Sequence, residues 1–415
     1  MSLHPPPLSA LGHLRAAVVH DWLPVYGGAE RVLEQMLHVL PRAEVYSLLD
    51  FVPEDQRGFL GGRDVHTSMI QRLPLARTRY RAYLPLAPLA IEGFDLDGYD
   101  IALSSSYVVA KGVLTSAEQL HVSYVHSPVR YAWDLQFTYL RDGGYTRGLR
   151  GFLARALLHY LRLYDVTSAS RPDLLLANSQ FVARRIWNTY RRRATVIHPP
   201  VDVEAFTLCE EKDGPYVTCS RLVPYKRVDL LVEAFRLMPQ RELVVIGDGP
   251  DLARLRALAP PNVRFLGRQP HEALAYYLRY ARGFLFGALE DFGIVPVEAM
   301  ACGTPVVAYG RGGACETVID GVTGVLFPKQ EPEAVAAAVQ RLEMTAFDPG
   351  RIRAHAERFS AARFRAELGA FLEAAWVQFE RDGPDTLHTL DAGFASFGRE
   401  RASGDGAREP SALNL

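Results

Sequence analysis

Cysteine, lysine and long apolar runs are scarce in this 415-residue chain, and each shortage excludes a class of protein. No apolar stretch approaches the length that spans a bilayer, and the N-terminus lacks the basic head and apolar core of an export signal. With 46 Lys and Arg against 47 Asp and Glu, the net charge of −1 does not suit a protein that wraps nucleic acid. The sequence therefore predicts a cytoplasmic protein with neither a transmembrane anchor nor a nucleic acid partner.

The few cysteines form no CxxC pair and no metal-ligand spacing: Cys209, Cys219, Cys302 and Cys315. Reduced, mostly buried thiols are the expectation for this pattern, with no disulfide and no zinc. The only lysines are Lys111, Lys212, Lys226 and Lys329, and all other positive side chains are arginines. A lysine kept at a ligand-binding position of such a chain indicates a chemical need for it.

The dinucleotide fingerprint GxGxxG is also absent. The run IGDGP at 246–250 has Leu252 where the third glycine belongs, which disfavours a nicotinamide enzyme.

Apolar segments of strand length alternate with helical segments, which predicts an α/β fold of two doubly wound, Rossmann-like domains. The expected strands are 16–20, 44–48, 101–104, 121–125, 174–177 and 195–197 in the first half, and 216–219, 242–246, 263–266, 283–286 and 305–308 in the second. We expect the domains to comprise residues 1–206 and 216–358, joined by a linker at 207–215. A helix at 359–381 crosses back to the first domain, and 382–415 is predicted to be a disordered tail.

The stretch 283–308 reads as a strand, an acidic turn, a helix and a second strand. Glu290 lies in the turn, and Glu298 lies one turn into a helix that starts near Gly293. Side chains of a helix lean toward its N-terminus, so the two carboxylates border one small space. The free amides of this helix start, at Gly293, Ile294 and Val295, favour phosphate binding. The alternative is that Glu298 lies on a solvated helix face.

Two positively charged side chains follow the first strand of the second domain. Arg221 follows the strand 216–219, and Lys226 begins the next helix. A planar guanidinium and a compact ammonium suit diphosphate oxygens. A solvated helix start is the alternative, weakened because a cation opposes the helix dipole there.

In the first domain, the glycine pair Gly27 and Gly28 lies between a strand and a helix, where backbone can approach a ligand closely. His126 follows an apolar strand, and ligands bind at that edge of an open α/β sheet. Two arginine-rich segments, 63–83 and 141–171, interleave with apolar residues. They fit either an anionic membrane surface or ordinary solvated helices.

Together these motifs resemble retaining glycosyltransferases of family 4, which have the GT-B fold of two Rossmann-like domains facing each other across a cleft. Arg221 with Lys226, the E-x7-E pair of Glu290 and Glu298, the Gly27 loop and His126 occur in the family's order over roughly residues 16–380. The runs HDWLPVYGGAERVLE, YVHSPVRYAWDL and EDFGIVPVEAMACGTPVVAYGRGG are most similar to a bacterial subgroup that builds O-antigen, capsular or exopolysaccharide chains. Its studied members include mannosyltransferases that use GDP-mannose. The family's lysine-glycine pair is here Lys226-Arg227.

The resemblance implies that the first domain binds the acceptor and the second binds the nucleotide sugar. Arg221 and Lys226 would bind the donor diphosphate, Glu298 the ribose hydroxyls and Glu290 the sugar hydroxyls. Gly28 would approach the phosphates, and His126 would contact the donor sugar near the reacting carbon. No cofactor or metal is expected. The implied partners are a nucleotide-sugar donor, best matched by GDP-mannose, a glycan or polyprenyl-linked glycan acceptor, and an anionic membrane at the inner face of the plasma membrane.

Other functions use some of the same groups. A GT-A enzyme would need an Asp-x-Asp metal site, but Asp95-Leu96-Asp97 precedes its strand and is predicted to be a surface turn. A glycoside hydrolase would use two carboxylates without phosphate-binding cations. A nucleotide-sugar epimerase of GT-B architecture would convert the donor without an acceptor, and a non-catalytic binding protein would hold it without transfer.

Overall fold

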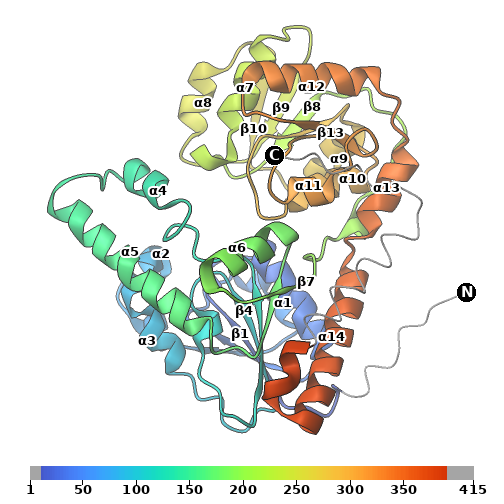
Figure 1. The fold of residues 1–415 in the computed structure, drawn as a ribbon. Helices are drawn as coiled ribbons and strands as arrows, with labels where there is room; N and C mark the ends of the chain where they lie inside the picture. The colour runs from blue at the N-terminus through green and yellow to red at the C-terminus, as the bar shows by residue number, and fades with distance from the viewer. Residues whose placement is uncertain (1–10, 390–415) are drawn as a thin grey trace, which may run out of the picture. The chain divides into compact units, whose positions relative to one another are not determined.

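The computed structural model describes residues 11–389, and the chain divides into two compact units (Figure 1). The first unit comprises the chain up to Ala177, the segment Ala183–Ile197 and the chain from Leu368 onward. The second comprises Asn178–Val182 and His198–Glu367. None of the helices within residues 11–389 is long and apolar enough to cross a membrane.

The first unit is built on a seven-stranded sheet in the order β3-β2-β1-β4-β5-β6-β7, with every neighbouring pair parallel. Strands β1, β4 and β5 are buried along their whole length, as central strands covered on both faces must be. The strands are β1 (Ala16–His20), β2 (Glu44–Ser47), β3 (Val65–Thr67), β4 (Ile101–Ser106), β5 (Leu120–Val125), β6 (Leu174–Ala177) and β7 (Thr195–Val196).

Helices, most of them short, fill the connections of this unit: α1 (Gly28–Val39), η1 (Glu54–Leu60), η2 (Met69–Arg72), α2 (Ala76–Arg79), η3 (Tyr80–Leu86), α3 (Ala87–Glu92), η4 (Ala110–Gly112), α4 (Gln136–Asp142), α5 (Gly148–Ser168) and α6 (Gln180–Tyr190). The helix predicted over 359–381 is α14 (Ala361–Asp382), which begins in the second unit and ends in the first. Of the predicted tail 382–415, the part up to residue 389 forms the end of α14 and the turn η7 (Pro384–Thr389), and 390–415 lies outside the described residues.

The second unit has a six-stranded parallel sheet in the order β10-β9-β8-β11-β12-β13. Its strands are β8 (Tyr216–Cys219), β9 (Leu243–Ile246), β10 (Val263–Gly267), β11 (Phe284–Phe286), β12 (Val306–Tyr309) and β13 (Gly324–Phe327). Its helices are η5 (Val203–Ala205), η6 (Pro224–Lys226), α7 (Val228–Arg236), α8 (Leu252–Leu258), α9 (His271–Tyr280), α10 (Ile294–Ala301), α11 (Ala314–Thr317), α12 (Pro332–Met344) and α13 (Pro349–Glu357).

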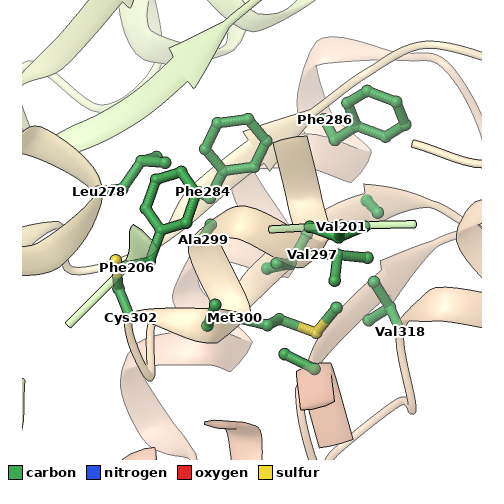
Figure 2. Packing of buried hydrophobic residues seen from close by; sticks show 14 of the residues in the cluster. Val201, Phe206, Leu278, Phe284, Phe286, Val297, Ala299, Met300, Cys302 and Val318 are labelled. Carbon is green, nitrogen blue, oxygen red and sulfur yellow. The ribbon is translucent and has the colours of Figure 1, made fainter. Parts of the chain in front are cut away.

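Alternate residues of each strand supply two cores on opposite faces of this second sheet, because successive side chains of a strand point to opposite sides. Val244 and Phe284 belong to one core with α9, α10 and α13, whereas Val245 and Leu285 belong to the other with α7, α8 and α12. Figure 2 shows the first of these cores around α10, where Phe206, Phe284 and Met300 gather. Each such side chain contributes roughly 1.5–3 kcal/mol of burial, which fixes the helix that carries Glu298.

The doubly wound architecture predicted for each half is therefore confirmed. Every predicted strand is present to within two residues, but β3 and β13 were not predicted, since the first is short and polar and the second follows directly on a turn. The units divide at Ile197, ahead of the predicted linker 207–215, which lies inside the second unit. The chain already joins that unit where Val201 N donates to Phe359 O. The expectation of mostly buried thiols was wrong: all four cysteines are free, but only Cys302 is buried.

Candidate functional site

Both sheets have a switch point, where the strand order reverses and the loops leaving two neighbouring strands separate. In the second unit this point lies between β8 and β11, which pair directly. The loop after β8 carries Arg221 and Lys226, and the loop after β11 carries Glu290. The predicted phosphate-binding and sugar-binding residues therefore share the edge at which open α/β sheets bind ligands.

Lys226 and Glu290 lie in direct contact. The Lys226 Nζ atom is 2.9 Å from Glu290 Oε1, and the two side chains are 21% and 14% exposed. The prediction that Lys226 begins the next helix was wrong, because Lys226 is the last residue of the 3-10 helix η6 and α7 starts at Val228. The Lys226 ammonium also lies 5.6 Å from the centre of the Tyr225 ring. The chain thus holds a cation and a carboxylate as a half-buried pair, open enough to exchange partners with a charged ligand.

Arg227 has a backbone conformation that L-residues rarely adopt, with φ of 53°. It joins η6 to α7 at the position where the related family has glycine. The left-handed region costs a non-glycine residue about 1–2 kcal/mol. Part of this cost is offset by the guanidinium, which donates to Gln330 Oε1 at 3.1 Å while Gln330 Nε2 donates to Gly287 O at 2.7 Å. The arginine side chain thereby ties the two ligand loops together.

The glycine run at 246–250 supports the Arg221 loop. Ser220 N donates to Ile246 O at 3.1 Å, and Leu222 N donates to Asp248 O at 2.9 Å. A Cβ atom on Gly247 would lie 1.9 Å from Ser220 O, so only glycine fits there. A run that fails as a dinucleotide fingerprint therefore serves to position Arg221, which is itself exposed.

Glu298 is 2% exposed on α10, whose N-terminus starts at Gly293 with φ of 96°. The neighbouring Cys219 thiol, at the end of β8, has its pKa raised to about 12, first by burial and then by the negative charge of Glu298, while Lys226 opposes the shift. The charges of Glu298 and Lys226 therefore both act on the Cys219 thiol, at the carboxyl end of β8. The alternative of a solvated helix face for Glu298 was wrong, because the residue is buried.

The turn that carries Glu290 is held by the glycine pair after β12. Gly313 N donates to Glu290 O at 2.8 Å, and a Cβ atom on Gly313 would lie 2.4 Å from Phe292 Cα. This packing was not predicted, although the run GRGG at 310–313 signals a close backbone approach.

In the first unit, His126 follows β5 and its Nε2 atom lies 2.8 Å from Ser105 Oγ. The same hydroxyl lies 3.0 Å from His20 Nδ1, and His20 Nε2 lies 3.6 Å from Glu30 Oε1. Glu30 Oε2 accepts a hydrogen bond from Gly27 N at 3.0 Å, and Gly28 begins α1. The structure therefore connects the predicted residues Gly27 and His126 through Glu30, which belongs to the predicted glycine loop, and through His20 and Ser105, which were not predicted. The pKa of His126 is lowered to about 3, chiefly by burial and secondly by His20.

Asp21, directly after β1, is a further buried residue that was not predicted. Its carboxylate accepts hydrogen bonds of 2.6–2.8 Å from the backbone N–H groups of Tyr107, Val108, Val109 and Ala110. It fixes the turn that follows β4, and with it the end of the strand that carries Ser105.

A cavity of about 410 Å³ lies beside the YAWDL segment of the first unit. Arg162 donates to Ala132 O at 2.9 Å, and Arg185 pairs with Asp134. Most of the residues that line it are of polar type, although their apolar atoms also face the cavity: Ala132, Trp133, Asp134, Gln136, Arg162, Arg185, Asn188 and Thr189. Two guanidinium groups beside amide and hydroxyl groups suit an anionic or hydroxylated ligand.

The predicted surface turn at Asp95 to Asp97 is confirmed, since Asp97 N donates to Asp95 Oδ1 at 3.0 Å and Gly98 follows with φ of 84°. Within residues 11–389, no three His, Cys, Asp or Glu side chains are arranged to hold a metal ion.

Two family models cover most of the chain. Residues 26–205 match the model described as Glycosyltransferase Family 4, and residues 203–358 match the model described as Glycosyl transferases group 1.

Curated relatives match over shorter stretches. A GDP-mannose-dependent alpha-(1-6)-phosphatidylinositol monomannoside mannosyltransferase of Mycolicibacterium smegmatis is 32% identical, covering 40% of this chain and 52% of the relative. A GDP-mannose-dependent monoacylated alpha-(1-6)-phosphatidylinositol monomannoside mannosyltransferase of Corynebacterium glutamicum is 35% identical, covering 35% and 46%. The chain thus spans about half the length of the curated relatives it matches.

Solved structures match over nearly the whole chain. Anabaena HepE in complex with UDP and glucose has a TM-score of 0.65 and 20% identity, covering 87% of this chain and 100% of HepE. The sucrose-phosphate synthase of Thermosynechococcus elongatus has a TM-score of 0.65 and 18% identity, covering 88% and 99%. At these identities the likeness shows a shared fold.

Proposed function

The chain belongs to glycosyltransferase family 4 and has the GT-B fold, and on that premise we propose that it is a retaining hexosyltransferase of cell-surface polysaccharide synthesis. It moves a hexose from a nucleotide-diphosphate sugar to a glycan or lipid-linked glycan. Mannose from GDP-mannose is the proposed donor, because two of its relatives are named as GDP-mannose-dependent.

The contact between Lys226 and Glu290 is the observation that carries this proposal. Both residues follow strands of the switch point, where a donor would lie. When a donor enters, its diphosphate replaces the carboxylate as the partner of Lys226, and Glu290 turns to the sugar hydroxyls. Arg221 adds a second cation, and buried Glu298 accepts from the ribose hydroxyls.

The chemistry follows from the charges that develop. Breaking the bond between the anomeric carbon and the diphosphate leaves an oxocarbenium-like sugar and a negative leaving group. Arg221, Lys226 and the amides of Gly293, Ile294 and Val295 neutralise that leaving group without a metal. Retention then follows if the acceptor attacks the same face and the departing phosphate takes its proton. His126 and the Gly28 backbone act on the donor from the first domain.

The features of the first unit support a lipid-linked acceptor. Helix α5, the long teal helix of Figure 1, carries an exposed apolar stripe with helical spacing: Leu149, Phe152, Leu153, Tyr160, Leu163 and Val166. Arg147, Arg150 and Arg155 lie beside the stripe. We infer that this face rests on the anionic inner surface of the plasma membrane, and that the adjoining polar cavity receives the acceptor head group.

A transfer assay tests the proposal. Purified full-length protein is screened by thermal shift against GDP, UDP and ADP sugars, because a ligand of the folded state raises its apparent stability. The best donor is then incubated with lipid-linked glycan acceptors, and the anomeric configuration of the product is read by NMR. Donor conversion without acceptor would support an epimerase instead, and tight donor binding with no product from any acceptor would support a binding protein.

A further inference from the structure

The cavity of about 410 Å³ in the first unit is lined by three segments of the chain. The segment 132–136 supplies one part of the lining, Arg162 comes from α5, and Arg185, Asn188 and Thr189 come from α6. Small-molecule sites usually have volumes of about 300–1,000 Å³. The cavity is therefore large enough for a ligand bigger than a single ion.

The positive charge of this cavity lies mainly on Arg162. The charge of Arg185 is balanced, because its guanidinium pairs with Asp134. Arg162 Nη1 donates instead to two neutral acceptors, Ala132 O at 2.9 Å and Gln136 Oε1. Among residues 11–389, Arg162 has no carboxylate partner, and its Nε and Nη2 groups donate to no protein atom. These two groups carry three of the five N–H donors of a guanidinium, so most of its donors are available to a ligand.

Two more polar side chains of the lining are also without a protein partner. Asn188 and Thr189 follow Arg185 by three and four residues on α6, so the three side chains share one face of the helix. In the part of the chain that the structure describes, neither the Asn188 nor the Thr189 side chain hydrogen-bonds to protein. Both side chains can donate a hydrogen bond. With Arg162 they make a set of donors with one unbalanced positive charge, which suits the oxygen atoms of a phosphate.

One aromatic side chain, Trp133, lines the same cavity and is anchored by a buried ion pair. Trp133 Nε1 donates to Asp165 Oδ2 at 2.7 Å, while Asp165 Oδ1 accepts from Lys111 Nζ at 2.5 Å and from Tyr190 OH at 2.9 Å. Lys111 and Asp165 are 1% and 0% exposed. Because the indole N–H is already bound to Asp165, the apolar atoms of the ring are what Trp133 offers to a ligand. A flat apolar surface suits the C–H groups of a sugar ring.

We propose that this cavity binds a phosphorylated sugar, with the phosphate on Arg162, Asn188 and Thr189 and the sugar ring against Trp133. Asp165 is a positioning residue of this site, because it holds the indole. That the phosphorylated sugar belongs to the acceptor rests on the proposed function, but the site itself does not. Lipid-linked glycans and free sugar phosphates share this chemistry, and the experiment separates them.

The chain contains a matched control for Arg162. Arg155 lies on the same helix, and its guanidinium also donates to neutral acceptors, Gly151 O and Thr146 O, both at 3.1 Å. It does not line the cavity. Arg155→Gln therefore removes the same charge from α5 and leaves the cavity unchanged.

Isothermal titration calorimetry tests the two halves of the site separately. Ligand-free full-length protein is titrated with mannose 1-phosphate, with mannose and with methyl phosphate. We expect mannose 1-phosphate to bind at least about tenfold more tightly than either fragment, because hydrogen bonds to a charged group and contact with the ring add to one another. Arg162→Gln should remove the advantage over mannose, and Trp133→Ala should remove the advantage over methyl phosphate. Asn188→Ala, a change at an exposed position that should not affect folding, should weaken binding of mannose 1-phosphate but not of mannose.

Two results would overturn the proposal. One is equal affinity of the wild type for mannose and mannose 1-phosphate, or an equal loss in Arg155→Gln and Arg162→Gln. The other is a loss in Lys226→Ala without a loss in Arg162→Gln, because the probe would then bind in the second unit.

A vesicle assay identifies the source of the phosphate. Phosphatidylcholine vesicles that carry polyprenyl-phosphate mannose are mixed with Arg162→Gln and with Arg155→Gln. Weaker vesicle binding by Arg162→Gln alone would assign the site to a lipid-linked phosphate. If Arg162→Gln binds these vesicles normally but has lost mannose 1-phosphate, the ligand is a free sugar phosphate.

Transfer kinetics separate this site from the proposed function. We expect Arg162→Gln to raise KM for a phosphate-bearing acceptor about tenfold with little change in kcat, because the phosphate is bound equally before and during the reaction. If the wild type transfers no sugar to any acceptor, the proposed function fails, while the titrations still decide whether the cavity binds a phosphorylated sugar.

Discussion

Lys226 Nζ lies 2.9 Å from Glu290 Oε1, so the residue expected to hold the donor diphosphate is paired with the residue expected to hold the donor sugar. The pair comes from two loops more than sixty residues apart in the sequence, which the parallel pairing of β8 with β11 brings together. In the proposed mechanism, the Glu290 carboxylate keeps the Lys226 ammonium oriented until phosphate oxygens of the donor replace it.

Lys226→Ala should therefore lower kcat by about 10²- to 10³-fold, since it removes a preorganised positive charge from the leaving group. Folding should be unaffected, because the Lys226 side chain lies in a loop at the carboxyl edge of the sheet and is only half-buried. Lys329→Ala is the matched control, since that lysine is 71% exposed and pairs with Glu331. Steady-state transfer rates check this prediction. Near-normal turnover by Lys226→Ala would remove Lys226 from the mechanism.

Strand ends were the part of this molecule that the sequence predicted best. Arg221, Lys226, Glu290 and His126 were singled out in segments that follow apolar, strand-like runs. The structure places His126 directly after β5 and the other three in the loops that follow β8 and β11. The residues behind them were not predictable in the same way. Ser105 and His20 are 85 positions apart, and only strand register brings them together.

Backbone conformation was the second limit. The departure from glycine at Arg227 was visible in the sequence, but its positive φ and the Gln330 contact that accompanies it depend on tertiary packing. The glycines at 247 and 249 were interpreted only as part of an incomplete dinucleotide fingerprint. Their close packing against the backbone of Ser220 and Leu222 depends on tertiary structure, which a sequence alone does not reveal.

The Gly247 position should tolerate no side chain. Gly247→Ala would place a Cβ atom 1.9 Å from Ser220 O at a φ of 131°, so the Arg221 loop must move. We expect a loss of about 3 kcal/mol or more in the free energy of unfolding, together with weaker donor binding. Gly267→Ala is the control, because that glycine also has positive φ but open space around it, and should cost about 1 kcal/mol. Denaturant unfolding of both variants measures the difference, and equal losses would contradict the steric explanation.

At Arg227 the shape of the side chain should matter more than its charge. Arg227→Gly removes the strain of a φ of 53° but also the bond to Gln330, so the free energy of unfolding should change by less than about 1 kcal/mol. Arg227→Val loses the same bond and adds a β-branched residue in the left-handed region, so it should be less stable than Arg227→Gly by about 2 kcal/mol. Chemical denaturation compares the two, and a valine variant as stable as the glycine variant would show that the turn relaxes.

The free energy of unfolding should decrease as the pH is lowered, over a range set by two buried histidines. The pKa values of His121 and His126 are lowered to about 3, in both cases chiefly by burial. Between pH 6.5 and 3 the unfolded chain therefore binds more protons at these residues than the folded chain, and acidification favours unfolding. Each histidine contributes a slope of up to about 1.4 kcal/mol per pH unit.

His121→Gln should reduce the slope of unfolding free energy against pH between pH 5 and 6. The reduction should be close to the full contribution of one histidine, about 1.4 kcal/mol per pH unit. Ser123→Ala, a buried change on the same strand that removes no titratable group, should leave it unchanged. Unfolding midpoints at several pH values supply the slopes. An identical slope in His121→Gln and the wild type would mean that His121 takes up its proton while the chain is still folded.

The exposed stripe of α5 should decide whether the chain binds membranes. Leu149 and Phe152 are 73% and 66% exposed, and full burial of such side chains is worth roughly 1.5–3 kcal/mol each. Replacing both with serine should lower partitioning onto vesicles rich in phosphatidylglycerol at least about tenfold, with no change in melting temperature, because neither side chain packs in a core.

Met344→Ser is the matched control, since Met344 is 81% exposed on α12 of the second unit. Vesicle flotation at low and high salt separates the two contributions, because salt screens the arginines beside the stripe but not its apolar contact. If the protein binds neutral and anionic vesicles equally, the arginines play no part in membrane binding. If the double serine variant binds as well as the wild type, the membrane-facing surface lies elsewhere on the chain.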